Sequence, residues 1–258
     1  MTQLNVQYID HMGNDLSVIR AATASFAKDP VEWDEQKHPR LINYLARGMT
    51  QADYDNMVEY LSGGQQSNSI NRSPRLDKQQ EVAEILEAYR HTPTHWSPFA
   101  HTAITLRLKA PIAIHAQVMK HTVGFAHNTV SRRYVSDTPE LFVPEFREAP
   151  QGNIKQGSGG LHRDRFDFAN WYKREANKSI KLYEKLIESG ASPEQARFVL
   201  PQGVMTEWVS TGSLYAWARL YRLRTDSHAQ KEIQELAEQI GQIIKPLFPC
   251  SWSALTGK

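Results

Sequence analysis

The chain has 258 residues, of which 40% are hydrophobic and 22% are charged, and its formal net charge is +2. This length is sufficient for one large domain with its own core, and the near balance of charge does not indicate a nucleic-acid or membrane partner. We find no signal-peptide pattern, and no apolar run approaches the roughly 18 residues that a membrane span needs. The only cysteine, Cys250, cannot form an intrachain disulfide, which is typical of a reducing compartment. We therefore expect a cytoplasmic protein.

The N-terminal part of the chain predicts one strand and several helices. Residues 5–10 read as a short strand, and Asp15 is a candidate N-cap for the helix that follows. Apolar residues at helical spacing predict short helices in three places: 41–45, 54–61 and 82–89.

The stretch 95–134 carries the densest group of polar and basic side chains. Alternating apolar and polar residues over 104–109 predict a strand. Pro111 suits the first turn of a helix, since its missing N–H is not needed there. We expect Gly124 to end this helix and a polar loop to lead to Tyr134. Three polar residues should share one face of the helix: Gln117, Lys120 and His121.

The C-terminal half predicts three further helices. A long amphipathic helix covers 166–188, a short one begins near Ser192 and ends at Pro201, and the last begins near Ser227 and stops before Pro246. No internal repeat or clear linker interrupts the chain. The sequence therefore predicts a single α+β domain over residues 1–258.

Several blocks of this sequence resemble the flavin-dependent thymidylate synthases. Lys120-His121-Thr122 and Ser131 stand where that family has Arg-His-Arg and, further on, a serine, and residues 128–134 (NTVSRRY) resemble its Asn-Glu-x-Ser-x-Arg-Tyr pattern. Three other blocks resemble the family in the same order: 12–26, 189–201 and 223–234. The resemblance implies a small antiparallel sheet packed with helices, in a homotetramer whose active sites lie between subunits. Relative to the family, the segment at about 27–94 is expanded.

The resemblance also implies a site for a pyrimidine deoxynucleoside monophosphate. The planar guanidinium of arginine binds phosphates and carbonyl edges through paired hydrogen bonds, although a single arginine is more often a surface or ion-pair residue. The implied substrate-binding residues are Gln117, Lys120, Ser131, Arg132, Arg133, Arg197 and Arg224. Arg224 is the predicted catalytic residue, which polarises the pyrimidine. Ser131 is assigned to binding, because no base oriented by a carboxylate accompanies it.

A second set of residues is implied to bind the flavin. Its members are His95, Ser97, His121, Thr122, Ser213, Arg219, Leu223 and His228. The chain departs from the family here, since Lys120 and Thr122 replace two arginines, Thr129 replaces a glutamate and Tyr215 stands where an arginine is usual. Our hypothesis is that Arg219 supplies the charge lost at Tyr215. No metal site is predicted, because the histidines do not have the spacing of helical metal ligands.

The resemblance implies an enzyme, a flavin-dependent thymidylate synthase-like methyltransferase. Its expected reaction converts dUMP to dTMP with 5,10-methylenetetrahydrofolate, FAD and NADPH, since no cysteine lies in a motif and a cofactor must supply the chemistry. One alternative is a hydroxymethylase acting on dUMP or dCMP. The other is a non-catalytic nucleotide-binding homologue.

Overall fold

The computed structural model describes residues 3–30, 32–47, 95–150 and 157–257. The predicted helices at 54–61 and 82–89 lie outside these residues. The chain divides into two compact units. The first contains Met1–Asp10, Ile104–Gly212 and Leu220–Ile243, and the second contains His11–Ala103, Ser213–Arg219 and Ile244–Lys258. None of the described helices has the length and apolar character needed to cross a membrane.

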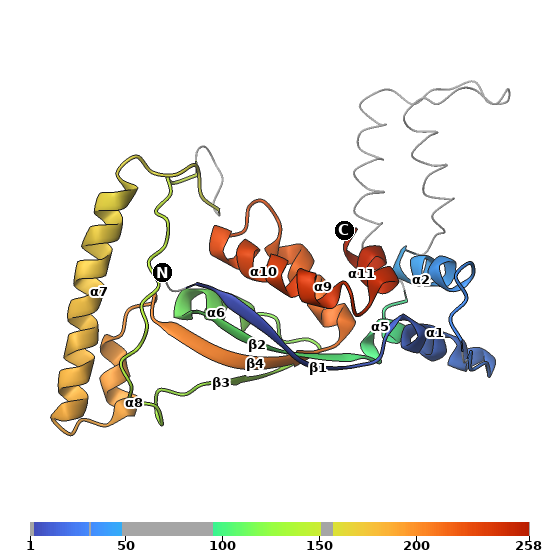
Figure 1. Cartoon of the computed structure of the whole chain (residues 1–258), viewed down its shortest axis with the longest axis horizontal. Coiled ribbons are helices and arrows are strands. Elements are labelled where there is room, and N and C mark those ends of the chain that lie inside the picture. The colour runs from blue at the N-terminus through green and yellow to red at the C-terminus, as the bar shows by residue number, and fades with distance from the viewer. Residues whose placement is uncertain (1–2, 31, 48–94, 151–156, 258) are drawn as a thin grey trace. The chain divides into compact units, whose positions relative to one another are not determined.

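A four-stranded sheet is the framework of the first unit (Figure 1). Its strand order is β1-β2-β4-β3, with β1 at Asn5–Met12, β2 at Ala103–Pro111, β3 at Phe125–Thr129 and β4 at Met205–Gly212. The inner strand β4 pairs antiparallel with both β2 and β3. The predicted α+β fold with a small antiparallel sheet is therefore confirmed.

The two faces of the sheet differ in polarity, because successive side chains of a strand point to opposite sides. On one face Leu108 lies opposite Trp208, and both are buried. Ser210 lies on this same face and is fully buried. On the other face, the hydroxyls of Thr105 and Thr211 are 2.9 Å apart.

Helices complete the first unit. They are α6 (Ile112–Val118), α7 (Arg165–Glu188), α8 (Pro193–Ala196), the 3-10 helix η2 (Arg197–Val199) and most of α10 (Lys231–Ile244). Helix α9 (Leu214–Arg224) begins in the second unit, and only its last five residues belong to the first. Gly241 of α10 lies against the ring of Tyr221 of α9, where a Cβ would come within 2.5 Å of a ring carbon. A residue without a side chain is therefore required at this helix contact.

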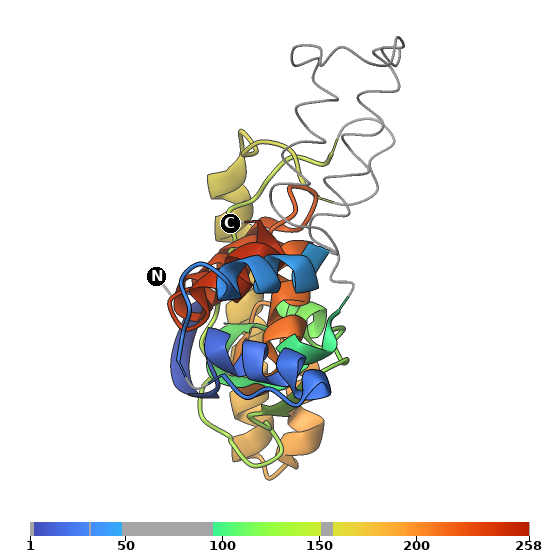
Figure 2. The same ribbon diagram turned by 90° about the vertical axis from the view of Figure 1, so that its right-hand side faces the viewer.

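The second unit contains α1 (Asp15–Thr23), η1 (Ala24–Phe26), α2 (His38–Arg47), α5 (Ser97–Ala100) and α11 (Pro249–Thr256). Helices α1, α2 and α11 contact one another, as two perpendicular views show (Figures 1 and 2). At the end of α1, Arg20 forms an ion pair with Asp29 at 3.2 Å and donates to the carbonyl of Pro30.

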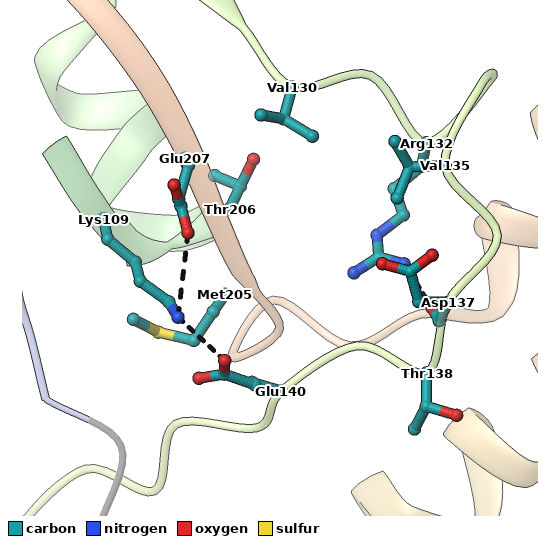
Figure 3. Close-up of a pocket in the computed structure, with 10 residues that line it drawn as sticks. All are labelled: Lys109, Val130, Arg132, Val135, Asp137, Thr138, Glu140, Met205, Thr206 and Glu207. Carbon is teal, nitrogen blue, oxygen red and sulfur yellow. Dashed lines mark hydrogen bonds and ion pairs between the residues drawn. The ribbon is translucent and has the colours of Figure 1, made fainter. Parts of the chain in front are cut away.

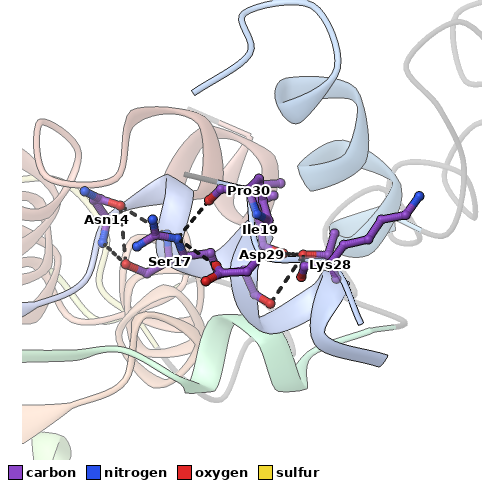
Figure 4. A network of polar contacts seen from close by, with 8 residues as sticks. Asn14, Ser17, Ile19, Lys28, Asp29 and Pro30 are labelled. Atoms are coloured by element: carbon purple, nitrogen blue, oxygen red, sulfur yellow. Dashed lines mark hydrogen bonds and ion pairs between the residues drawn. The ribbon is translucent and has the colours of Figure 1, made fainter. Parts of the chain in front are cut away.

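Two neighbouring residues cap different helices of this unit. Asn14, not Asp15, caps α1, since its side chain and that of Ser17 each accept a backbone N–H from the other at 3.1 Å (Figure 4). Asp15 is buried and accepts from the backbone N–H groups of Cys250 at 2.8 Å and Ser251 at 2.9 Å, in the first turn of α11. Burial and the Asp15 carboxylate raise the pKa of the Cys250 thiol to about 11.

The structure corrects several predicted boundaries. The helix after Pro111 ends at Val118, well before Gly124, and the expected polar loop contains strand β3. The last long helix begins at Lys231 and not near Ser227. The strand over 104–109 and the long helix over 166–188 are confirmed. Strand β4 and helices α9 and α11 were missed.

Candidate functional site

Arg224 lies at the C-terminal end of α9, against the end of α6. Its Nε donates to Nε2 of His121 at 2.9 Å, and its Nη2 donates to the carbonyl of Gln117 at 3.2 Å. The side chain of Gln117 in turn donates to Oε1 of Gln230 at 2.7 Å. The structure thus brings together three of the residues singled out in the sequence: Gln117, His121 and Arg224.

The contacts of Arg224 define its charge and that of its neighbour. A guanidinium can only donate, so Nε2 of His121 must carry a lone pair, and the ring is neutral with its proton on Nδ1. Burial lowers the pKa of Arg224, and no described residue forms an ion pair with it. A half-buried cation with neutral partners retains its attraction for an electron-rich ligand atom.

Lys120 does not share a helical face with Gln117, because α6 has ended before it. It lies exposed in the turn that follows the helix, as does Thr122 just beyond it. The prediction that Lys120 and His121 share a helix face with Gln117 is therefore wrong, because both residues follow the end of α6.

A second group of predicted residues surrounds Glu194 at the start of α8. Arg133 Nε lies 3.2 Å from Oε2 of Glu194, and Arg197 donates to the Glu194 carbonyl at 3.2 Å. Ser131 accepts from the backbone N–H of Arg133 at 3.3 Å. Both arginines are exposed. The segment after β3 and the start of η2 therefore place two guanidinium groups at one residue, one at its carboxylate and one at its backbone carbonyl.

Arg132 points in another direction, into a cavity of about 240 Å³ on the first unit (Figure 3). It donates to the carbonyl of Asp137. Across the cavity Lys109 lies 2.8 Å from Glu140 and 3.7 Å from Glu207, and the hydrogen bond to Glu140 raises the pKa of the lysine. The lysine of this cavity is therefore paired with its two glutamates.

Four of the predicted flavin-binding residues belong to the second unit. His95 stacks on Tyr44 with ring centroids 5.6 Å apart. Ser97 begins the short helix α5. Ser213 accepts from the backbone N–H of Ala216 at 3.2 Å, so it caps the start of α9.

The fourth residue of that unit, Arg219, follows Tyr215 by one helical turn. Its guanidinium lies over the Tyr215 ring at 5.6 Å, and that ring stacks on Trp96 at 5.7 Å. The indole of Trp96 is 52% exposed. Arg219 provides an exposed cation, and Ser97 and Ser213 provide hydroxyls, which suit a diphosphate. Trp96 provides an exposed aromatic plane, which suits a flat ring. These residues therefore fit a flavin nucleotide.

The remaining predicted flavin residues lie in the first unit. His121 accepts a hydrogen bond from Arg224. Leu223, which precedes Arg224 in the sequence, is 58% exposed. His228 lies in the loop before α10, where its Nδ1 is 3.0 Å from Asp226 and its N–H donates to the same carboxylate.

Two histidines of the first unit were not selected from the sequence. His127 lies on β3, not in a loop, with Nδ1 2.7 Å from the Ser210 hydroxyl and Nε2 3.1 Å from the carbonyl of His121. His115 lies 2.9 Å from the Thr129 hydroxyl, and burial lowers its pKa. The alternation of Phe125, His127 and Thr129 was a strand signal that could have revealed both contacts.

Comparison with known proteins defines the family. The sequence profile of the thymidylate synthase complementing protein family matches residues 7–250. Flavin-dependent thymidylate synthase from Thermotoga neapolitana is 28% identical over 96% of this chain and 89% of its own length. The enzyme of the same name from Thermosipho africanus is 33% identical over 62% of this chain and 71% of its own.

A solved structure has the same fold. The crystal structure of a UMP/dUMP methylase, PolB from Streptomyces cacaoi, bound with 5-Br dUMP, has a TM-score of 0.75 and 24% identity, covering 99% of this chain and 96% of that one. The chain belongs to the thymidylate synthase complementing protein family, whose curated relatives are flavin-dependent thymidylate synthases. The predicted family and enzyme class are confirmed.

Proposed function

We propose that this protein transfers a one-carbon unit to C5 of a pyrimidine deoxynucleotide, and that its reaction converts dUMP to dTMP. The observation that carries this proposal is the Arg224 site, in which a half-buried guanidinium contacts only neutral partners in the described residues. Family membership supplies the class of reaction, and the geometry supplies a residue suited to it.

Arg224 acts on the pyrimidine ring in this proposal. Attack from C5 on a one-carbon donor requires electron density to shift within the ring, and a fixed cation at a ring carbonyl stabilises the charge that develops. The hydrogen bonds to His121 and Gln117 fix the guanidinium, so that little reorganisation is needed when the reaction occurs.

Arg133 and Arg197 hold the phosphate, with the hydroxyl of Ser131 beside them. Both arginines are exposed and meet at Glu194, so an incoming phosphate can replace part of the contact that the carboxylate makes. Lys120 and Arg132 are proposed to add positive charge to the approach of the nucleotide.

The proposed cofactors are FAD, NADPH and 5,10-methylenetetrahydrofolate. When bound, the flavin supplies the reducing equivalents that turn the transferred one-carbon unit into a methyl group. His95, Ser97, Ser213 and Arg219 of the second unit are proposed to contact it. Flavin contact by His121, Thr122, Leu223 and His228 of the first unit stays a prediction from the resemblance. We also propose that the protein assembles as a homotetramer.

The test is to incubate the purified protein with FAD, NADPH, methylenetetrahydrofolate and either dUMP or dCMP, and to identify the product by mass. We expect one methyl group on dUMP, dependent on FAD. A hydroxymethyl group on either nucleotide would replace the synthase with a hydroxymethylase. Binding of dUMP without any product would contradict catalysis.

A further inference from the structure

Ser210 places a hydroxyl in the interior of the first unit. Its side chain is fully buried on the same face of β4 as Trp208. The register of the sheet sets it opposite His127 on β3, and its Oγ lies 2.7 Å from Nδ1 of that ring. A buried hydroxyl costs free energy unless it is hydrogen-bonded, and His127 supplies this bond.

The other nitrogen of His127 reaches the backbone of the turn after α6. Its Nε2 lies 3.1 Å from the carbonyl oxygen of His121. A carbonyl only accepts, so Nε2 carries the proton, and Nδ1 of the neutral ring accepts from the Ser210 hydroxyl. The ring of Phe125 stacks on that of His127 at 5.3 Å and holds its plane. The three groups form a directed chain of hydrogen bonds that ends at the peptide of His121.

His121 is therefore held at its backbone on both sides. Its N–H donates to the carbonyl of Val118 at 2.9 Å, and its own carbonyl accepts from His127. Only the side-chain torsions then remain to orient the imidazole, whose Nε2 accepts from Arg224. The position of the guanidinium consequently depends on a serine and a histidine that do not contact it.

We propose that Ser210 and His127 are positioning residues for Arg224 and act through the backbone of His121. This inference rests on the proposed function, in which Arg224 contacts the pyrimidine. The phosphate is bound elsewhere, by Arg133 and Arg197, so the pair influences the rate of turnover and leaves nucleotide affinity nearly unchanged.

Three substitutions of His127 separate positioning from packing. His127→Gln places an amide nitrogen near the original Nε2 and keeps the bond to the His121 carbonyl, while His127→Asn reaches only to the original Nδ1, and His127→Phe keeps the ring without either nitrogen. We expect kcat for dUMP to fall about thirtyfold in the Asn and Phe variants, and to stay within about threefold of wild type in the Gln variant. The Kd for dUMP should change by less than about threefold in all of them, because phosphate contacts dominate it.

Thr211→Val is the matched control. It removes one side-chain hydrogen bond from the residue next to Ser210, on the opposite face of the same strand, where Thr211 meets Thr105 at 2.9 Å. Wild-type kcat is expected for this control, whereas Ser210→Ala should lower kcat. Equal losses in Thr211→Val and Ser210→Ala, following the melting temperature, would overturn the proposal.

A second readout does not require turnover. The Nε–H resonance of Arg224, assigned by its absence in Arg224→Lys, should be protected from solvent exchange in wild type and in His127→Gln, and lost in His127→Asn. An unchanged resonance in the Asn and Phe variants would overturn the positioning role. If wild type neither binds nor converts dUMP, the proposed function fails, and this resonance alone decides the structural inference.

Discussion

Arg224 and His121 join their side chains through a hydrogen bond of 2.9 Å across 103 positions of sequence. The bond requires a neutral imidazole, because the guanidinium nitrogen can only donate. It links the turn that carries the altered signature, Lys120-His121-Thr122, to the end of α9. His121 was expected to contact the flavin, and the structure gives it a partner among the nucleotide residues.

The first prediction concerns the shape of the cation at position 224. Arg224→Lys keeps the positive charge but loses the planar group that reaches both His121 and the Gln117 carbonyl. We expect kcat to fall about a hundredfold, as when one fixed donor is lost from a charge-stabilising site. Steady-state kinetics with dUMP measures this, and Arg174→Ala, an exposed arginine of α7, is the control. Unchanged kcat in Arg224→Lys would remove the residue from the reaction.

A second prediction concerns Arg219 and the flavin. The guanidinium lies over Tyr215, the position where the family usually has an arginine. Arg219→Ala should weaken FAD binding about tenfold or more, since a charge-assisted contact to phosphate is lost. A second change, Tyr215→Arg, should restore part of the affinity. Titration of flavin fluorescence measures both, and full FAD affinity in Arg219→Ala would rule out this role.

Gly241 is expected to tolerate no side chain. Alanine normally stabilises a helix interior relative to glycine, but a Cβ at this position would lie 2.5 Å from a ring carbon of Tyr221. Gly241→Ala should therefore destabilise the protein by about 1–3 kcal/mol, measured by chemical denaturation. Gly160→Ala is the control, since a Cβ there meets nothing within 4 Å. Equal stability of the two variants would contradict the prediction, because it would mean that α9 and α10 accommodate the added methyl group without loss of stability.

His115 should make stability depend on pH. Burial lowers its pKa from the ordinary value of 6.5, so the unfolded chain binds the proton more tightly than the folded one. The contribution of this group is complete above pH 6.5 and is lost as the pH falls from there through the folded pKa. Melting temperature measured against pH should decline over this range, and less steeply in His115→Gln. Parallel curves for the two proteins would contradict this assignment.

The sequence alone predicted the parts of the fold that have strong local patterns. The alternation around Leu106 and the long stripe of α7 each indicate their element, because burial of one face follows from periodicity. Strand β4 was missed, although Trp208 and Ser210 alternate with more exposed neighbours. Its place as an inner strand depends on pairing with two distant segments, and a short window of sequence does not contain that information.

The candidate site was predictable only as far as the resemblance reached. Residues such as Arg224 and Arg197 were selected because they match family positions. His127 and Ser210 match no motif and lie 83 positions apart, so their contact depends on the register between β3 and β4. The same is true of the hydrogen bond by which Asp15 caps α11, since 235 positions separate Asp15 from Cys250. Such pairs follow from the tertiary structure and not from local sequence.

The most direct test of the central claim is release of tritium from [5-³H]dUMP. One-carbon transfer to C5 breaks the C5–H bond whichever group is finally attached, so the label must appear in water. We predict release that requires the folate and falls about a hundredfold in Arg224→Lys. Retention of all tritium by a protein that binds dUMP, FAD and folate would contradict C5 chemistry and leave a nucleotide-binding protein.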